Sequence, residues 1–221
     1  MSGPRVCILD VDGTLIDSND AHARAWAETG AELGYDIAFE AVRPLIGMGG
    51  DRVLPRVAGV EADSPEGKRL SERRGELFRE RHLPTLRAFP EARALLERMR
   101  AAGLTLVVAS SASADDLGAL LRQAGVDDLI EAETNADDAE ASKPAPDIVA
   151  AALASAGAAP HEAVMLGDTP YDVESAGRAG VRCIALRCGG WDDEALRGAV
   201  AIHDDPADLL AHFDTSPLVA P

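Results

Sequence analysis

Cysteine, lysine, aromatic residues and long apolar runs are all scarce in this chain of 221 residues. The three cysteines, Cys7, Cys183 and Cys188, are too few and too scattered for a disulfide framework or a zinc site. No apolar stretch is long enough to span a bilayer, and the first residues lack the charged-then-apolar pattern of a secretion signal. These absences argue against disulfide-rich, zinc-stapled and membrane-spanning proteins, and we expect a cytoplasmic globular protein.

Positive charge is also in short supply. The formal net charge of −17 at pH 7 argues against nucleic acid as a partner, because phosphates require a basic face. We expect a monomer that binds neither nucleic acid nor membrane. Only two of the 21 basic residues are lysine, at Lys68 and Lys143. Because the chain uses arginine almost everywhere else, a lysine hints that the ammonium group itself is needed.

Short β-branched runs alternate with helical patterns along most of the chain. Three helical patterns end in Ala-Gly, at Gly103, Gly125 and Gly180, and an apolar run follows each. Glycine just past a helix end is typical of a left-handed cap, and the run after it is typical of a buried strand. We predict strands over Val6–Asp10, Leu104–Ala109, Ile130–Glu133, Val164–Leu166, Cys183–Leu186 and Ala199–Ile202. This alternation predicts an α/β fold, with a Rossmann-like parallel sheet covered on both faces.

The stretch from residue 17 to residue 84 breaks the alternation. It contains no convincing strand, and its ten basic against thirteen acidic residues make it far less acidic than the rest of the chain. We predict an all-helical insert over residues 17–84, and a core domain formed by residues 1–16 and 85–221. The tail, residues 214–221, is predicted to fray.

Polar side chains follow the predicted strands at the points where they end. They are Asp10, Asp12, Ser110, Ser111, Asp168 and Asp172, with Lys143 ahead of a later helix. The carboxyl ends of parallel strands meet at one edge of a sheet, where the crevice of an open α/β fold lies. Carboxylates gathered there repel one another unless a cation joins them, and Mg²⁺ suits a site made of oxygen ligands. The pattern therefore predicts a magnesium site at this edge.

Four motifs, "DVDGTLIDS", "VVASSAS", "ASKPAPD" and "LGDTPYD", occur in this order over most of the chain. Together they resemble the haloacid dehalogenase-like superfamily. The resemblance is greatest to its phosphatases with a helical cap, close to the β-phosphoglucomutase-like and phosphoglycolate phosphatase-like members. It implies Mg²⁺-dependent hydrolysis of a small phosphorylated metabolite, a phosphomonoester, beneath a helical cap.

The resemblance also implies roles for the matching residues. Asp10 corresponds to the nucleophile, which becomes an aspartyl-phosphate, and Asp12 to the general acid/base. Ser110 corresponds to the hydroxyl that holds a phosphoryl oxygen, helped by the Ser111 backbone. Lys143 corresponds to the cation that neutralises the nucleophile and the developing charge on the phosphoryl group.

The implied metal ligands are Asp10, the Asp12 backbone carbonyl and Asp168. Asp172 is implied to support these ligands or to pair with Lys143. A simpler interpretation stays open for the last two acids, because Asp168 and Asp172 also suit the start of a helix.

In the insert, the candidate substrate-binding residues are His22 and the loop residues Gly49, Gly50 and Arg52. Glycines let a backbone approach a substrate closely, and Arg52 offers a cation. A surface histidine and a flexible turn between helices are the alternative interpretations.

Two other functions stay open. A β-phosphoglucomutase-like mutase is favoured by "DSNDAHARAW" and "EASKPAPDI". Against it, Gly167 stands where those mutases have a glutamate, and Gly50 stands about where they have an arginine. A non-catalytic binding module is the other alternative, although no expected catalytic position is lost. Dehalogenation is disfavoured by Asp12, because displacing a halide needs no proton for a leaving alcohol.

Overall fold

The computed structural model describes residues 3–138 and 141–219. Its centre is a parallel six-stranded sheet with the strand order β3-β2-β1-β4-β5-β6. The strands are β1 (Val6–Leu9), β2 (Thr105–Ala109), β3 (Ala132–Thr134), β4 (Ala163–Gly167), β5 (Arg182–Leu186) and β6 (Ala201–His203). Every predicted strand is present, with ends displaced by no more than two residues.

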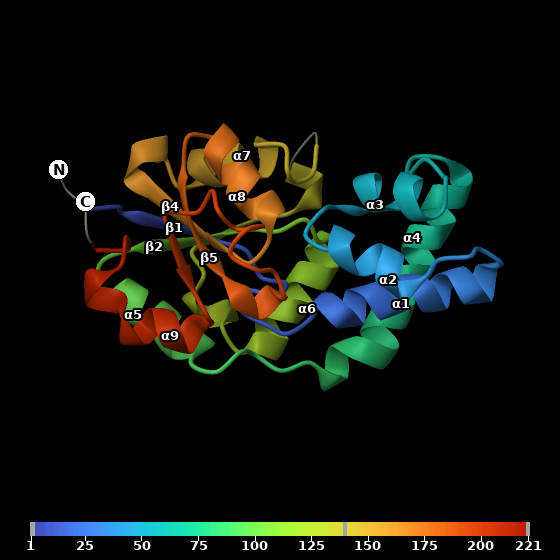
Figure 1. Cartoon of the computed structure of the whole chain (residues 1–221), viewed down its shortest axis with the longest axis horizontal. Coiled ribbons are helices and arrows are strands. Elements are labelled where there is room, and N and C mark those ends of the chain that lie inside the picture. Colours follow the sequence, from blue (N-terminus) through green and yellow to red (C-terminus); the bar gives the residue numbers. More distant parts are fainter. Residues whose placement is uncertain (1–2, 139–140, 220–221) are drawn as a thin grey trace.

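Helices cover both faces of the sheet, as Figure 1 shows. One face carries α7 (Asp147–Ser155) and α8 (Pro170–Arg178), and the other carries α5 (Ala92–Ala101), α6 (Ala114–Ala124) and α9 (Pro206–Ala211). Alternate residues of a strand point to opposite faces, so Cys7 and Leu9 pack with one layer while Val6 and Ile8 pack with the other. Double coverage explains why β1 is apolar throughout.

The order of the strands places the loops after β1 and β4 side by side. The chain builds β2 and β3 on one side of β1 and then returns to build β4, β5 and β6 on the other. In register, Leu9 pairs with both Val108 of β2 and Leu166 of β4. Open α/β sheets bind ligands beyond the carboxyl ends of their strands, where the strand order reverses in this way.

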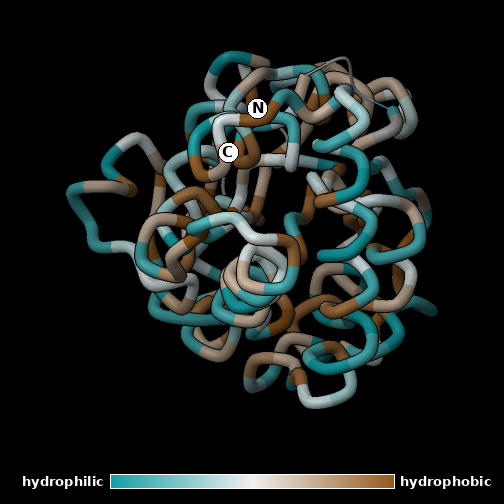
Figure 2. Tube along the Cα trace, turned by 90° about the vertical axis from the view of Figure 1, so that its right-hand side faces the viewer, coloured by the Kyte–Doolittle hydropathy of each residue, from teal (hydrophilic) through white to brown (hydrophobic). Residues whose placement is uncertain are grey.

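Residues 17–84, called the helical segment below, lie beyond that edge of the sheet (Figure 1). The segment contains α1 (Asn19–Leu33), α2 (Phe39–Val42), α3 (Gly50–Val57), α4 (Pro65–Leu77) and the π-helical turn η2 (Phe78–His82), and no strand. Trp26, Leu54 and Leu70 belong to an apolar cluster of its own. Seen from this end of the molecule, the apolar stretches of the trace lie mostly inside it (Figure 2).

The helix ends agree with the prediction from the sequence, whereas the C-terminal tail differs from it. Gly103, Gly125 and Gly180 have φ angles of 88°, 67° and 74°, the left-handed conformation expected of them. The prediction of a frayed tail is wrong for residues 214–219, because Leu218 is 2% exposed and packs into the core of the sheet. Residues 220 and 221 lie outside the described residues. No helix within the described ranges is long and apolar enough to cross a membrane.

Candidate active site

Asp10 continues the line of β1, because its backbone N–H donates to the Leu166 carbonyl oxygen at 2.9 Å. Lys143 Nζ lies 2.5 Å from Asp10 Oδ1 and 2.8 Å from Asp172 Oδ1. The Lys143 side chain is fully buried. Burial acts to lower the pKa of Lys143, but Asp10 and Asp172 outweigh it and hold that pKa above its ordinary value. Lys143 is therefore a buried ammonium group shared by two carboxylates.

Asp168 follows β4 and is also fully buried. The Thr14 hydroxyl lies 2.8 Å from Asp168 Oδ1 and 3.1 Å from Asp10 Oδ2, and so it links the two carboxylates. Asn19 Nδ2 donates to Asp168 Oδ2 at 2.9 Å. A Cβ atom at Gly189 would lie only 1.7 Å from Asp168 Oδ2, so glycine is required beside this carboxylate.

Carboxylate oxygens of Asp10, Asp168 and Asp172 lie within 4.8 Å of one another. Burial raises the pKa of Asp10 to about 7, with Asp172 and Asp12 adding to the rise and Lys143 opposing it. Burial likewise raises the pKa of Asp168, helped by Asp10 and Asp172. Three carboxylates against the one ammonium group of Lys143 leave two negative charges unbalanced when all are ionised. A buried set of oxygen donors with this charge fits a divalent cation such as Mg²⁺.

Asp172 has two roles in the structure. Its Oδ2 accepts from the Thr169 N–H at 3.0 Å and from the Thr169 hydroxyl at 2.6 Å, which forms a capping box at the start of α8. Its Oδ1 faces Lys143. Asp172 therefore both pairs with Lys143 and caps α8, whereas Asp168 bonds to Thr14 and Asn19 rather than capping the helix.

One carboxylate oxygen of Asp12 contacts the helical segment. Asp12 Oδ1 accepts from the Ser18 hydroxyl at 2.5 Å and lies 2.7 Å from His22 Nε2. Burial acts to raise the pKa of Asp12, but His22, Ser18 and Arg74 together hold that pKa below its ordinary value. His22 is 3% exposed and stacks on Phe78, so the alternative of a surface histidine is wrong.

The contacts of Asp12 extend through His22 to a pair of arginines. Arg74 Nη2 lies 2.7 Å from His22 Nδ1, and Arg74 Nη1 donates to Asp116 Oδ2 at 3.1 Å. Arg79 Nη1 donates to Asp116 Oδ1 at 2.7 Å. Because a guanidinium group can only donate, His22 Nδ1 accepts, and the proton of the neutral ring is on Nε2, toward Asp12. The chain of contacts thus crosses from the sheet to the helical segment and back to α6.

Sequence reasoning missed Arg74, Arg79 and Asp116. Asp116 follows the N-cap Ser113 of α6, a position at which an acidic residue is usual without any function. The two arginines belong to a charged stretch with no distinguishing pattern. Only the fold shows that Asp116 is 2% exposed and joined to both.

Thr14, Ser18 and Asn19 were not among the predicted site residues either. The sequence offered a reason to predict them, because all three lie in "DVDGTLIDSND", shortly after the paired aspartates. Each is almost fully buried, and each bonds to a carboxylate of the site. A buried polar residue next to a candidate site is therefore itself a candidate.

A cavity of about 520 Å³ lies between the sheet and the helical segment. Asp10 and Asp12 line it, as does Ser111. The opposite walls include the apolar side chains of Trp26, Met48 and Val53 and the guanidinium groups of Arg74 and Arg79. The cavity therefore has room for a small polar molecule with both apolar and cationic contacts.

The predicted substrate-binding residues divide into two groups. His22, Gly50 and Ser111 line the cavity, whereas Ser110 and Lys143 are fully buried and do not line it. The Ser110 hydroxyl oxygen accepts from the Ala112 N–H at 3.1 Å.

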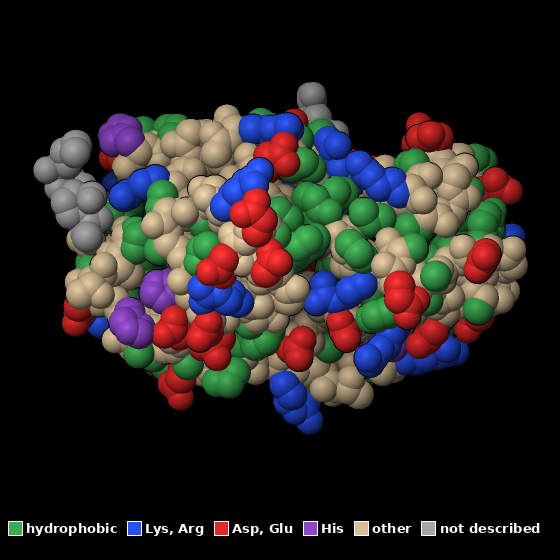
Figure 3. Space-filling view, viewed as in Figure 1, with side chains coloured by type: hydrophobic (Ala, Val, Ile, Leu, Met, Phe, Trp, Pro, Cys, Tyr) green, Lys and Arg blue, Asp and Glu red, His purple; other side chains and the backbone are tan. Residues whose placement is uncertain are grey.

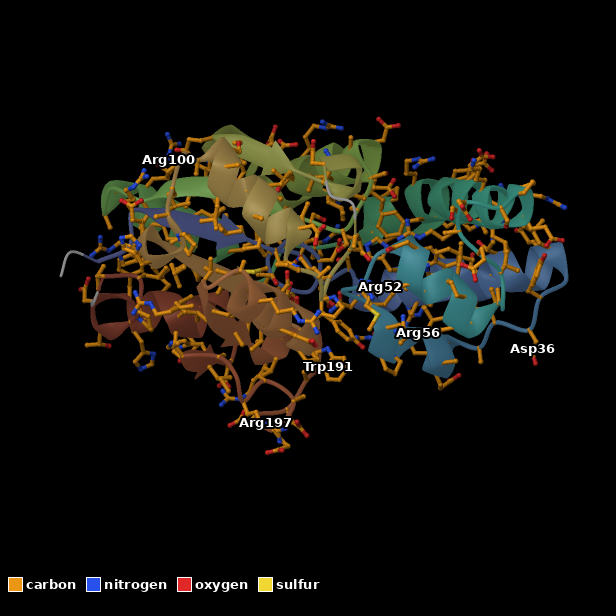
Figure 4. The ribbon with its side chains drawn as sticks, turned by 90° about the horizontal axis from the view of Figure 1, so that it is seen from above. Asp36, Arg52, Arg56, Arg100, Trp191 and Arg197 are labelled. Carbon is orange, nitrogen blue, oxygen red and sulfur yellow. The ribbon has the colours of Figure 1, made fainter. Side chains whose placement is uncertain are left out.

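Gly49 and Arg52 are not among the residues that line the cavity. A Cβ atom at Gly49 would lie 2.7 Å from Ser142 Cβ. Arg52 Nε donates to the Ser142 carbonyl oxygen at 3.1 Å, where the helical segment meets the sheet's loops. Figure 4 shows Arg52 at this boundary.

Comparison with known proteins identifies the family to which this sequence is similar. The sequence model of the haloacid dehalogenase-like hydrolase family matches residues 7–186. A phosphoglycolate phosphatase from Yersinia pestis is 30% identical over 210 residues, covering 93% of this chain and 88% of that protein. The chloroplastic protein SUPPRESSOR OF QUENCHING 1 from Arabidopsis thaliana is 32% identical over 184 residues, covering 81% of this chain but only 17% of that protein.

The fold is shared with solved structures as well. A hydrolase from Pseudomonas syringae superposes with a TM-score of 0.87 at 31% identity, covering 95% of this chain and 98% of that one. The match extends over almost the whole length of both chains and so includes the helical segment. The chain therefore belongs to the haloacid dehalogenase-like hydrolase family, as an enzyme similar to that family's phosphatases.

Proposed function

We propose that this chain hydrolyses a small phosphomonoester, with Asp10 as the nucleophile and Mg²⁺ as the cofactor. The observation that carries the proposal is the arrangement around Asp10. This carboxylate lines the cavity while Lys143 holds one of its oxygens and Thr14 lies beside the other. Attack on a phosphoryl group in line with the leaving oxygen gives an aspartyl-phosphate, and Lys143 balances the charge that develops.

Asp12 is proposed to move the proton in both steps. It first protonates the leaving oxygen and then takes a proton from the water that attacks the aspartyl-phosphate. The low pKa of Asp12 suits the second step, because the carboxylate is then ready to act as a base. In the first step, the negative charge of an approaching phosphate group would raise this pKa and favour the protonated form.

The proposed metal ligands are Asp10, Asp168 and the backbone carbonyl of Asp12. Asp172 is left as their support, because its two oxygens already face Lys143 and Thr169. When bound, Mg²⁺ would neutralise the surplus charge of the buried carboxylates and polarise the phosphoryl group. Thr14 and Asn19 hold the Asp168 carboxylate in place for this purpose.

The helical segment is proposed to act as a cap over a core domain made of residues 1–16 and 85–221. Its contacts with the sheet's loops include a Tyr171 hydroxyl that donates to the Pro44 carbonyl oxygen at 2.6 Å. A closed cap would exclude bulk water during attack and would admit only small substrates.

We propose a second anionic group on the substrate, as in the phosphoglycolate that the similar phosphatases are named for. Arg79 lines the cavity and has one Nη atom on Asp116, which leaves its other donors to bind a carboxylate.

Hydrolysis is favoured over mutase chemistry by the space around Gly167. A Cβ atom at that position would lie 2.6 Å from both Cβ and Cγ of Asp172. The glutamate that the mutases carry there would displace Asp172 from Lys143. A binding module is disfavoured because burying three carboxylates costs stability, and buried titratable groups with shifted pKa values gather mainly at active sites.

The proposal is tested by phosphate release from phosphoglycolate and from hexose phosphates. We expect release with Mg²⁺, and a rate at least about a hundredfold lower with EDTA, because a metal ion supplies several kcal/mol of charge stabilisation. Phosphoglycolate should have the higher kcat/KM. Conversion of β-glucose 1-phosphate into glucose 6-phosphate without free phosphate would instead assign the chain to the mutases.

Mg²⁺ is also expected to stabilise the fold, and more at about pH 8 than at about pH 5. The pKa of Asp10 rises from 3.8 to about 7 on folding. Below pH 3.8 this group therefore contributes fully to the free energy of unfolding, and that contribution is lost as the pH rises through 7. Mg²⁺ restores it, because the ion binds the ionised carboxylates, whereas below pH 7 protons compete with the metal. At a concentration 100 times its Kd the ion should add about 2.7 kcal/mol to the free energy of unfolding.

The measurement is the thermal unfolding midpoint with and without Mg²⁺ at the two pH values, with NaCl at equal ionic strength as the control. A shift that is equal at both pH values, or larger at the lower one, would contradict binding at these carboxylates.

A further inference from the structure

A second cluster of metal-ligating side chains lies at the edge of the sheet, and the proposed reaction does not use it. His203 is the last residue of β6, Asp208 lies in α9, and His212 directly follows α9. Figure 3 shows histidine side chains gathered with acidic ones over α9 on the face in view. None of the three residues belongs to the four motifs of the sequence.

The three side chains converge on one point. His203 Nδ1 lies 2.9 Å from Asp208 Oδ2, and His212 Nδ1 lies 3.1 Å from Asp208 Oδ1. One ring nitrogen from each histidine and one oxygen of Asp208 all lie within 4.8 Å of one another. Two ligands about 2.1 Å from a tetrahedral ion are themselves roughly 3.4 Å apart, close to these separations. His212 Nδ1 also lies 2.9 Å from the Asp208 carbonyl oxygen, so His212 must give up this contact to bind an ion.

Neighbouring residues hold the Asp208 carboxylate in place and leave it free to bind a metal ion. The Asp204 N–H donates to Asp208 Oδ2 at 3.2 Å, which orients the carboxylate. The neighbouring acids have other partners, because Asp204 pairs with Arg187 and Asp205 caps α9. The His212 side chain is 60% exposed, so water can complete the coordination.

We propose that His203, Asp208 and His212 form a binding site for a divalent transition-metal ion of the Zn²⁺ type. Two imidazoles with one carboxylate prefer Zn²⁺, Co²⁺ or Ni²⁺ to Mg²⁺, which prefers oxygen ligands. The net charge of −17 also favours accumulation of cations at the surface. The site is separate in chemistry from the carboxylate cluster around Asp10, and the proposal does not depend on the proposed phosphatase reaction.

The test is a calorimetric titration of the full-length chain with Zn²⁺, carried out in millimolar Mg²⁺ so that the carboxylate cluster is already occupied. Co²⁺ binding is followed in parallel by visible absorption, which reports nitrogen ligands. The variants are His203→Ala, His212→Ala and both together. The matched control is His161→Ala, an exposed histidine in the turn before β4.

We expect one ion per chain in the wild type and in His161→Ala. Removing a residue that hydrogen-bonds to a metal ligand lowers metal affinity about 10–100-fold. Removing a ligand itself should therefore weaken Zn²⁺ binding at least about a hundredfold. The proposal is overturned if the double variant binds Zn²⁺ as tightly as the wild type. It is equally overturned if the wild type binds none, because the cluster would then be a set of ion pairs only. Circular dichroism of each variant separates loss of the site from loss of the fold.

Discussion

Replacing Asp10 by Asn is expected to abolish phosphate release, with a fall in kcat of at least about 10⁴-fold. An amide cannot attack the phosphoryl group, and no other described carboxylate both lines the cavity and lies beside Lys143. The fold should survive, because a neutral amide is easier to bury than a carboxylate whose pKa is already raised to about 7. We therefore expect a thermal unfolding midpoint close to that of the wild type.

The measurement compares phosphate release and thermal unfolding in the same preparations. Asp36→Asn is the matched control, because this aspartate is exposed at the far end of the helical segment (Figure 4). A variant that keeps substantial turnover at position 10 would remove Asp10 from the role of nucleophile. A variant that loses both activity and fold would show that Asp10 is structural.

Replacing Lys143 by Met is expected to lower both activity and stability. Lys143 is fully buried between Asp10 and Asp172, so its loss leaves two carboxylates without their common cation. Breaking a buried ion pair in this way costs about 3–5 kcal/mol in the free energy of unfolding. For a chain of this size the unfolding midpoint should fall by roughly 6–20 °C. Phosphate release should fall as well, because nothing replaces the charge beside Asp10.

Two further variants separate charge balance from catalysis. Lys68→Met removes the other lysine, which is exposed on α4, and should change neither quantity. Adding Asp172→Asn to Lys143→Met removes one of the stranded carboxylates and should recover part of the stability but none of the activity. Recovery of activity in the double variant would mean that Lys143 serves only to balance Asp172.

Much of the candidate active site could be predicted from local sequence. The β1 run and the aspartates after it are contiguous, and parallel pairing places the ends of β1 and β4 at one level. Asp10, Lys143, Asp168 and Asp172 are accordingly brought together as the motifs suggested. The position of the helical insert was also visible, because its residues lack the strand patterns of the remainder.

The contacts across the cavity could not be predicted in the same way. His22 was a candidate, but its burial against Phe78 depends on how α1 packs against η2. Gly49 and Arg52 looked equivalent to Gly50 in sequence, yet only Gly50 lines the cavity, because Ser142 occupies the space beside the other two. These outcomes depend on packing between distant segments, which a local pattern does not encode.

The sequence by itself determined the strand runs of the parallel sheet, the helical insert and the set of carboxylates at the strand ends, because apolar runs, glycine helix caps and the polar residues that follow a strand are local patterns of the chain. Only the tertiary structure decided which arginines face the cavity and that Asp116 joins Arg74 and Arg79, and so through Arg74 reaches His22 and Asp12. It also decided that His203, Asp208 and His212 converge. Arginine and aspartate are common on any surface, and their partners are fixed only when separate elements pack and exclude water between them.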